Sequence, residues 1–196
     1  GCGRRFDVFA SLSYLLLGDA DAVCELLTSL ASQASGQYLH PNPAQPEAWI
    51  TSETPADAAP RQGHAPVARG VMLSLVEDLV ARELPLLHAE LHAAGMPSGL
   101  PAARWLDTCW LNFLTWRSLV TATLLPLMLG ADFVIFQCVA AMRHVSAMQH
   151  AASPSATLSL RMLLPLEHFD LLAELPYMLE LRRRHGERCQ AAMSML

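Results

Sequence analysis

Lysine is absent from this sequence, and all 13 basic residues are arginines. Charged residues make up only 16% of the chain, well below the ~25% of an average domain, so the folded surface must carry fewer charges than usual. The net charge is −5 at pH 7, and the arginines are scattered. The basic patch expected of a nucleic-acid binder is therefore missing, and we expect no nucleic-acid partner.

Isoleucine is scarce as well, with only two residues, and valine occurs ten times, whereas leucine (35) and alanine (29) dominate. Because β-branched residues favour strands while leucine and alanine favour helices, this composition predicts an all-α fold. A chain of 196 residues that is 53% hydrophobic can bury a core without disulfides or metals. We therefore expect one multi-helix domain over residues 1–196, with no cofactor and no metal.

The five cysteines, at positions 2, 24, 109, 138 and 189, are odd in number and include no C-x-x-C pair. This pattern excludes a disulfide framework and a zinc ribbon, and it predicts reduced core thiols in a cytoplasmic protein.

The most apolar stretch, 118–142, is interrupted by Gly130 and Asp132, which leaves pieces shorter than the ~20 residues that a membrane span needs. We expect two buried helices there and no membrane span.

The opening G-C-G-R-R has no initiator methionine and no cleavage-site pattern after it, which predicts an excised part of a longer protein.

Helical periodicity and capping residues divide the rest of the chain. The expected helices cover 6–17, 20–30, 67–82, 85–91, 102–114, 118–129, 132–149 and a last segment from 176 onward. Segment 132–149 is apolar nearly all round and is expected to be the central helix. Segment 40–66 carries six prolines and is predicted to be a loop or a disordered insertion.

The sequence contains no complete catalytic or metal-binding motif. His88 and His92 have the i, i+4 spacing of zinc ligands, but the sequence H-A-E-L-H places its glutamate away from the position of a metalloprotease base. No third ligand is evident, so we interpret the pair as helix-surface or interface histidines. The sequence also lacks a G-x-S-x-G elbow, a P-loop and a G-x-G-x-x-G motif.

Two groups of residues are candidates for binding a partner protein. Tryptophans within one segment could form a binding surface or could belong to the core, and the arginine run near residue 182 could meet an acidic partner or simply face water. The candidate partner-binding residues are Trp105, Trp110, Trp116, Arg117, Arg182 and Arg183.

The order of features from Val71 to Gln149 resembles the second, all-helical half of TBC domains, the Rab GTPase-activating fold. There, a helix of the type L-x-E-D-L-V-x-x-x-L-P-x-L-H-x-x-L precedes a W-F-L-x-x-F-like helix, a helix ending in glycine and a long apolar helix. The corresponding segments here are L-V-E-D-L-V at 75–80, L-P-L-L-H at 84–88, W-L-N-F-L at 110–114, L-G at 129–130 and F-V-I-F at 133–136. The likeness covers about 80 residues and implies a TBC-like domain.

TBC domains accelerate GTP hydrolysis through two finger residues, an arginine in I-x-x-D-x-x-R and a glutamine in Y-x-Q, which act on the γ-phosphate of a bound Rab GTPase. Neither finger motif is present in this sequence. The isoleucines at positions 50 and 135 are followed three residues on by glutamate and cysteine, and no tyrosine is followed two residues on by glutamine. The R-I-W-D element of the second half is also missing, and L-L-P-L at 124–127 takes its place. We therefore expect no enzyme activity.

Among finger-less members, the chain looks most like the C-terminal TBC-like domain of a large ciliary protein, through R-F-D-V-F-A at 5–10 and L-L-G-D at 16–19. This resemblance implies a non-catalytic interaction or scaffold module of a larger protein that acts in cilium or flagellum assembly. It implies a cytoplasmic location at the cilium, flagellum or basal body. The implied partners are other proteins, with a cell-cycle-related kinase or a small GTPase as candidates.

Two alternatives stay open at this point. The chain could be a Rab GTPase-activating domain whose finger residues lie upstream of Gly1. It could also be a generic helical-repeat scaffold segment of the HEAT type, which would stack helix pairs in one direction around an open concave face.

Overall fold

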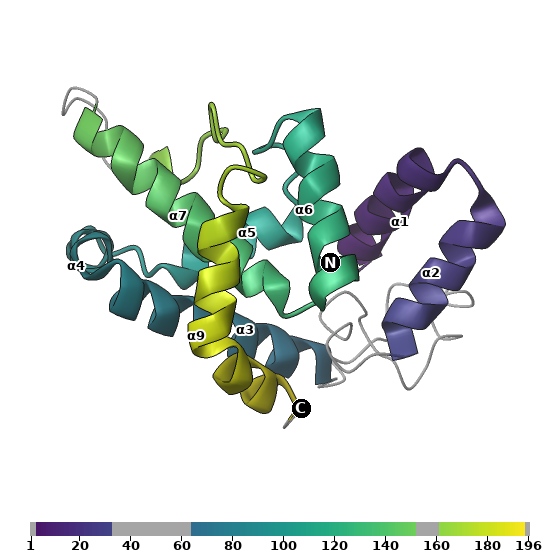
Figure 1. Cartoon of the computed structure of the whole chain (residues 1–196), viewed down its shortest axis with the longest axis horizontal. Helices are drawn as coiled ribbons and strands as arrows, with labels where there is room; N and C mark the ends of the chain where they lie inside the picture. The colour runs from purple at the N-terminus through teal and green to yellow at the C-terminus, as the bar shows by residue number, and fades with distance from the viewer. Residues whose placement is uncertain (1–2, 33–63, 152–160, 195–196) are drawn as a thin grey trace, which may run out of the picture. The chain divides into compact units, whose positions relative to one another are not determined.

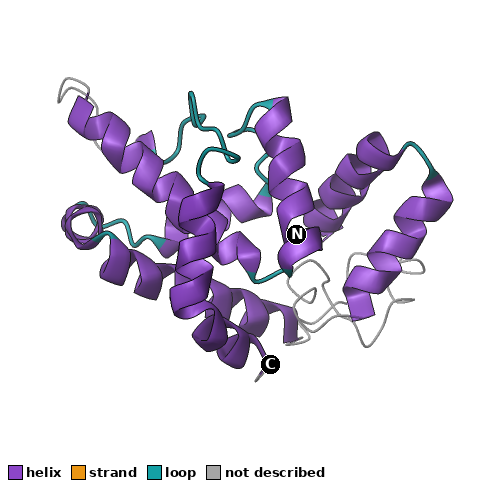
Figure 2. Ribbon diagram, in the orientation of Figure 1, coloured by secondary structure: helices purple, strands orange, loops and turns teal. Residues whose placement is uncertain are grey.

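The computed structural model describes residues 3–32, 64–151 and 161–194, and within these ranges the chain forms helices and turns without a strand (Figure 2). The predicted all-α class is confirmed. The helices are α1 (Gly3–Leu17), α2 (Ala20–Ser32), α3 (His64–Glu83), α4 (Pro85–Ala93), α5 (Gly99–Asp107), α6 (Trp116–Leu129), α7 (Phe133–Ala151) and α9 (Leu175–Ser194) (Figure 1). None of the described helices is long and apolar enough to cross a membrane.

The chain divides into two compact units, which we describe separately. The first unit comprises Gly1–Val71 and Met193–Leu196, and the second comprises Met72–Ala192. The single domain over residues 1–196 stays a prediction. The predicted Pro-rich segment 40–66 lies outside the described residues up to position 63. Its last three residues belong to the first turn of α3, where Pro66 is tolerated because its missing N–H would have no helical partner.

The first unit contains the predicted helical hairpin of α1 and α2. Helix α1 ends at Gly18, which adopts a left-handed φ of 69° that glycine accepts without steric cost. The Gly18 N–H closes the last turn by donating to the Tyr14 carbonyl at 2.8 Å. Asp19 then caps α2, since its carboxylate accepts the Asp21 N–H at 3.1 Å. The end of α1 at Leu17 and the start of α2 at Ala20 agree with the expected helices 6–17 and 20–30.

Helix α7 is the buried helix of the second unit, as the all-round apolar pattern predicted. Every residue from 131 to 142 is buried. Phe133, Ile135, Phe136 and Met142 have no exposed surface, and each such side chain stabilises the fold by about 1.5–3 kcal/mol. The other elements of the unit must therefore cover α7 on all sides.

One buried polar contact joins α6 to α7. Pro126 lies inside α6, and because proline has no N–H, the carbonyl of Ala122 loses its helical donor. The side chain of Gln137, which is fully buried in α7, replaces that donor: its Nε2 donates to the Ala122 oxygen at 3.0 Å. The proline and the glutamine are thus complementary parts of one joint.

Ion pairs join α9 to α3 where the two helices cross (Figure 1). The Glu83 carboxylate accepts from Arg184 at 2.8 Å and from His185 at 2.7 Å. Arg188 pairs with Asp78 of α3. Because the later residue of α9 meets the earlier residue of α3, the helices are antiparallel.

One expectation about side chains needs correction, and one gains detail. Arg184 and Arg188 are exposed, as expected of the arginines of 182–188, and each also pairs with a carboxylate of α3. The cysteines were expected in the core, and this is right for Cys138 and Cys189 but wrong for Cys24, which is exposed. Burial raises the pKa of Cys138 well above its usual range and that of Cys189 to about 11.

We predict that Gln137→Leu lowers the free energy of unfolding by about 1–3 kcal/mol, because it leaves the buried Ala122 carbonyl without a donor. Pro126→Ala restores the helical N–H to that carbonyl. Gln137→Leu should therefore cost much less in the Pro126→Ala background, which a double-mutant cycle by chemical denaturation would measure. Additive effects of the two substitutions would show that the Gln137 hydrogen bond does not depend on Pro126.

Candidate functional site

Two of the candidate tryptophans follow an unexpected end of α5. A helix was predicted over 102–114, but α5 ends at Asp107. Cys109 and Trp110 then adopt left-handed φ angles of 47° and 64°, and the Trp110 N–H donates to the Trp105 carbonyl at 2.8 Å. A left-handed conformation costs a non-glycine residue about 1–2 kcal/mol, so the surrounding packing must offset it.

The turn at Cys109 and Trp110 brings the indole of Trp110 back onto that of Trp105. The two ring centroids lie 5.2 Å apart with an interplanar angle of 21°, and the edge of Phe113 adds a third ring. Trp105 is fully buried and Trp110 is 4% exposed. The structure therefore assigns both tryptophans to the core, which corrects their place among the candidate partner-binding residues.

Trp116 and Arg117 are different, because they begin α6 at the surface. Thr115 caps the helix by accepting the Ser118 N–H at 3.4 Å, and the Ser118 hydroxyl donates to the buried Phe169 carbonyl at 2.9 Å. This pair of contacts turns Ser118 inward. The Trp116 side chain is left 55% exposed, and the Arg117 side chain is exposed beside it.

Trp116 heads a row of apolar side chains along α6, which we call the α6 stripe: Trp116, Val120, Leu124 and Met128. The four-residue spacing places them on one side of the helix. Leu124 is 41% exposed and Met128 is 77% exposed, whereas Leu119 and Leu125 on another side are buried. Sequence reasoning missed Leu124 and Met128 as candidates. The sequence did hold a signal for them: the apolar residues of α6 lie on more sides of the helix than α7 alone can cover, so some of them must be exposed.

The two candidate arginines of α9 are held by neighbouring side chains. Arg183 forms two hydrogen bonds with the carboxylate of Glu180, at 2.7 and 2.8 Å. Its donation keeps the pKa of Glu180 below the usual value. The guanidinium of Arg182 lies 6.0 Å from the ring centroid of Phe133. Both arginines lie on a different helix from Trp116 and Arg117.

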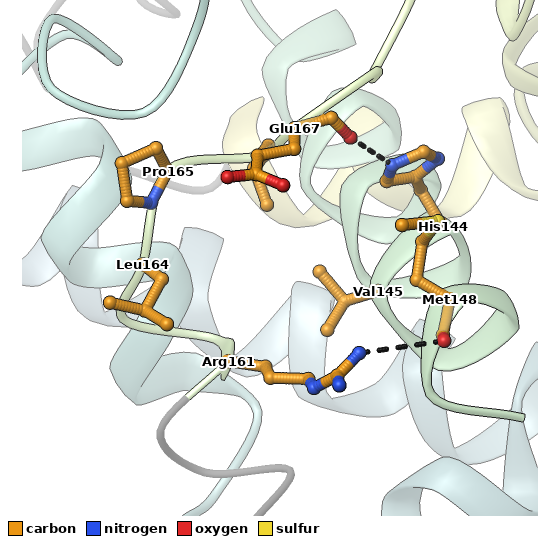
Figure 3. Close-up of a pocket in the computed structure, with 8 residues that line it drawn as sticks. His144, Val145, Met148, Arg161, Leu164, Pro165 and Glu167 are labelled. Atoms are coloured by element: carbon orange, nitrogen blue, oxygen red, sulfur yellow. Dashed lines mark hydrogen bonds between the residues drawn. The ribbon is translucent and has the colours of Figure 1, made fainter. Parts of the chain in front are cut away.

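A pocket of about 490 Å³ lies between the C-terminal half of α7 and segment 161–167 (Figure 3). His144 and Arg161 donate to the backbone carbonyls of Glu167 and Met148, at 2.9 and 3.4 Å. Since a carbonyl only accepts, the Nε2 of His144 must carry the proton in this contact. The side chains of His144 and Arg161 are thus engaged with backbone, the Glu167 carboxylate also lines the pocket, and the remaining lining is mainly apolar.

The α6 stripe is an exposed, mainly apolar row of side chains. It presents a large aromatic ring, a leucine and a flexible methionine, with one exposed guanidinium at its end. Aromatic residues, methionine and arginine are the types enriched at the centres of protein interfaces. No nucleophile or acid–base pair belongs to the stripe.

The helical fold and the order of its elements define a TBC-like domain. From residue 3 to residue 196 the chain matches the sequence model of the Broad-minded protein Rab TBC domain, and it therefore belongs to this family. The predicted resemblance is confirmed, and the match decides against a generic helical-repeat segment.

Two proteins of known name resemble the chain. It is 26% identical to Protein broad-minded of Danio rerio over 182 residues, which are 91% of this chain and 14% of that protein. It is 26% identical to Protein broad-minded of Mus musculus over 70 residues, which are 36% of this chain and 5% of that protein. The chain thus spans a small part of the length of these relatives. No solved structure matches it.

Substitution should separate the core tryptophans from the exposed one. We predict that Trp105→Ala lowers the free energy of unfolding by about 3–5 kcal/mol, because it removes a fully buried indole and leaves a cavity. Trp116→Ala should change it by at most about 0.5 kcal/mol, since more than half of that side chain is exposed. Denaturant titration of both variants measures the difference, and equal losses would refute the assignment.

Proposed function

We propose that this chain is a non-catalytic protein-interaction module of a longer protein, and that it binds its partner through the α6 stripe. The observation that carries the proposal is the exposure of Trp116, Leu124 and Met128 on one side of a helix whose opposite side, including Leu119 and Leu125, is buried. Contiguous exposed apolar side chains on a helix are typical of protein-binding surfaces. Arg117 at the end of the stripe favours a partner with an acidic group beside its apolar residues.

The sequence supports the non-catalytic part of the proposal. An arginine finger contributes a factor of about 10³–10⁵ to GTP hydrolysis, so a TBC-like domain without one is not expected to act as a catalyst. Neither finger motif occurs in the 196 residues. A second candidate function, a Rab GTPase-activating domain completed by upstream finger residues, would need the missing motifs to come from elsewhere in the longer protein.

The resemblance to a ciliary protein supports a role in cilium or flagellum assembly. We propose that the longer protein acts in cilium or flagellum assembly, in the cytoplasm at the cilium or basal body. A cell-cycle-related kinase and a small GTPase are the candidate partners. In either case the helical scaffold would present the α6 stripe, and the partner would supply any catalysis.

We predict that the purified chain, at catalytic amounts, does not accelerate GTP hydrolysis by Rab proteins. The measurement is phosphate release from a panel of GTP-loaded Rab proteins, with an active TBC domain as the positive control. Acceleration by the 196-residue chain would contradict the proposal. Acceleration by the longer protein alone would favour upstream finger residues.

We predict that Trp116→Ala weakens partner binding by about 2 kcal/mol or more, roughly 30-fold, because exposed tryptophans dominate interface energies. Leu124→Ala should weaken it less. Leu179→Ala is the matched control, since Leu179 of α9 is 43% exposed and lies off the stripe. Calorimetry with purified candidate kinases and small GTPases measures the affinities, and circular dichroism checks that each variant folds.

The same variants test in cells whether the α6 stripe is needed for cilium assembly. In ciliated cells that lack the longer protein, the full-length Leu179→Ala variant should restore cilium assembly, and the Trp116→Ala variant should not. Rescue by both variants would exclude the α6 stripe as the functional surface.

A further inference from the structure

Three ligand-type side chains converge where α3 meets α4. His88 and His92 lie one turn apart on α4, with ring centroids 4.8 Å from each other. Glu77 approaches them from α3. Its Oε1 lies 3.0 Å from the Nε2 of His88 and 3.7 Å from the Nε2 of His92. One donor atom from each of the three residues lies within 4.8 Å of the others.

We propose that Glu77, His88 and His92 bind a divalent transition-metal ion of the zinc type. Imidazole nitrogen and carboxylate oxygen are ligands that zinc prefers, and two histidines with one carboxylate form a known three-ligand set. A tetrahedral ion with bonds of about 2.0–2.1 Å places its ligand atoms roughly 3.4 Å apart. The observed separations of 3.0 and 3.7 Å lie on either side of that value.

The Glu77 carboxylate is already oriented for this task. Its other oxygen, Oε2, accepts the N–H of Gly99 at the start of α5, at 2.8 Å. Such a second contact fixes a ligand so that the metal-facing oxygen stays in place. An ion bound here would join α4 to α3 and, through this contact, to α5.

Solvent access to the site is also suitable. Glu77 and His88 are each 26% exposed, and His92 is 62% exposed. An ion can therefore enter from solution, and a water molecule can take the fourth position. The exposed His92 side chain can move by the small distance needed to complete the coordination.

The sequence had left the histidine pair without a third ligand, and Glu77 supplies it from the preceding helix. The hydrogen bond between Glu77 and His88 explains the position of those two side chains without a metal. It does not require His92 to point at the same oxygen. His92 also lies within ion-pair distance of Glu77, so the alternative to metal binding is a cluster of ion pairs, which would take up no ion. This proposal does not depend on the proposed binding function.

The test is calorimetric titration of the tag-free 196-residue chain with Zn²⁺, after treatment with a chelator. We expect one ion per chain, and an affinity about tenfold or more lower in His92→Ala and in Glu77→Gln. Glu77→Gln keeps an oxygen that can accept the Gly99 N–H, so it separates ligation from folding. Glu90→Gln is the control, because Glu90 is exposed on the same helix and is not one of the three ligands.

A second measurement follows the fold itself. Zn²⁺ should raise the melting temperature of the unmodified chain and of Glu90→Gln, because an ion that binds only the folded state stabilises it. It should not raise that of His92→Ala. Absence of binding to the unmodified chain, or equal binding and equal stabilisation in His92→Ala, would overturn the proposal.

Discussion

The second unit depends on the contact between α6 and α7. The first half of α7, up to Met142, is buried on every side, so this part of the helix is stable only when other elements surround it. The one amide in its middle, Gln137, donates through its Nε2 to the carbonyl that Pro126 leaves open in α6, while its Oε1 is buried without a hydrogen-bond partner among the described residues. Hydrophobic burial alone would let α6 slide or rotate over α7. The buried hydrogen bond fixes one register and thereby decides which side chains of α6 face outward.

This register links the fold to the proposed function. The resemblance to TBC domains sets L-L-P-L at 124–127 in the place of their R-I-W-D element. In this chain Leu124 points into the α6 stripe, while Leu125 and Pro126 are buried. Residues 124–127 thus contribute to the contact with α7 on one side and to the α6 stripe on the other. This arrangement supports the proposed binding surface.

Local chemistry made much of the fold predictable from sequence. Gly18, Gly95 and Gly130 each have positive φ beside a helix end, and such ends depend on neighbouring residues only. The buried α7 was evident from its composition. The turn at Cys109 and Trp110 was not, because its left-handed backbone is stable only when the indole packs on Trp105. Likewise, Glu77 reaches His88 across a helix boundary, and Arg184 meets Glu83 from 101 residues away.

The antiparallel pairing of α3 and α9 has a mechanical consequence. The chain enters the second unit along α3 and leaves it along α9, so both connections lie at the same end of this helix pair. Tension that pulls the two connections apart would load the Arg188–Asp78 contact first and the contacts of Glu83 afterwards. The ion pairs between the two helices would then break one after another. They would not share the load, as they would if the force acted along the helix axes. Within a large assembly, this end of the unit is where applied force would first open the fold.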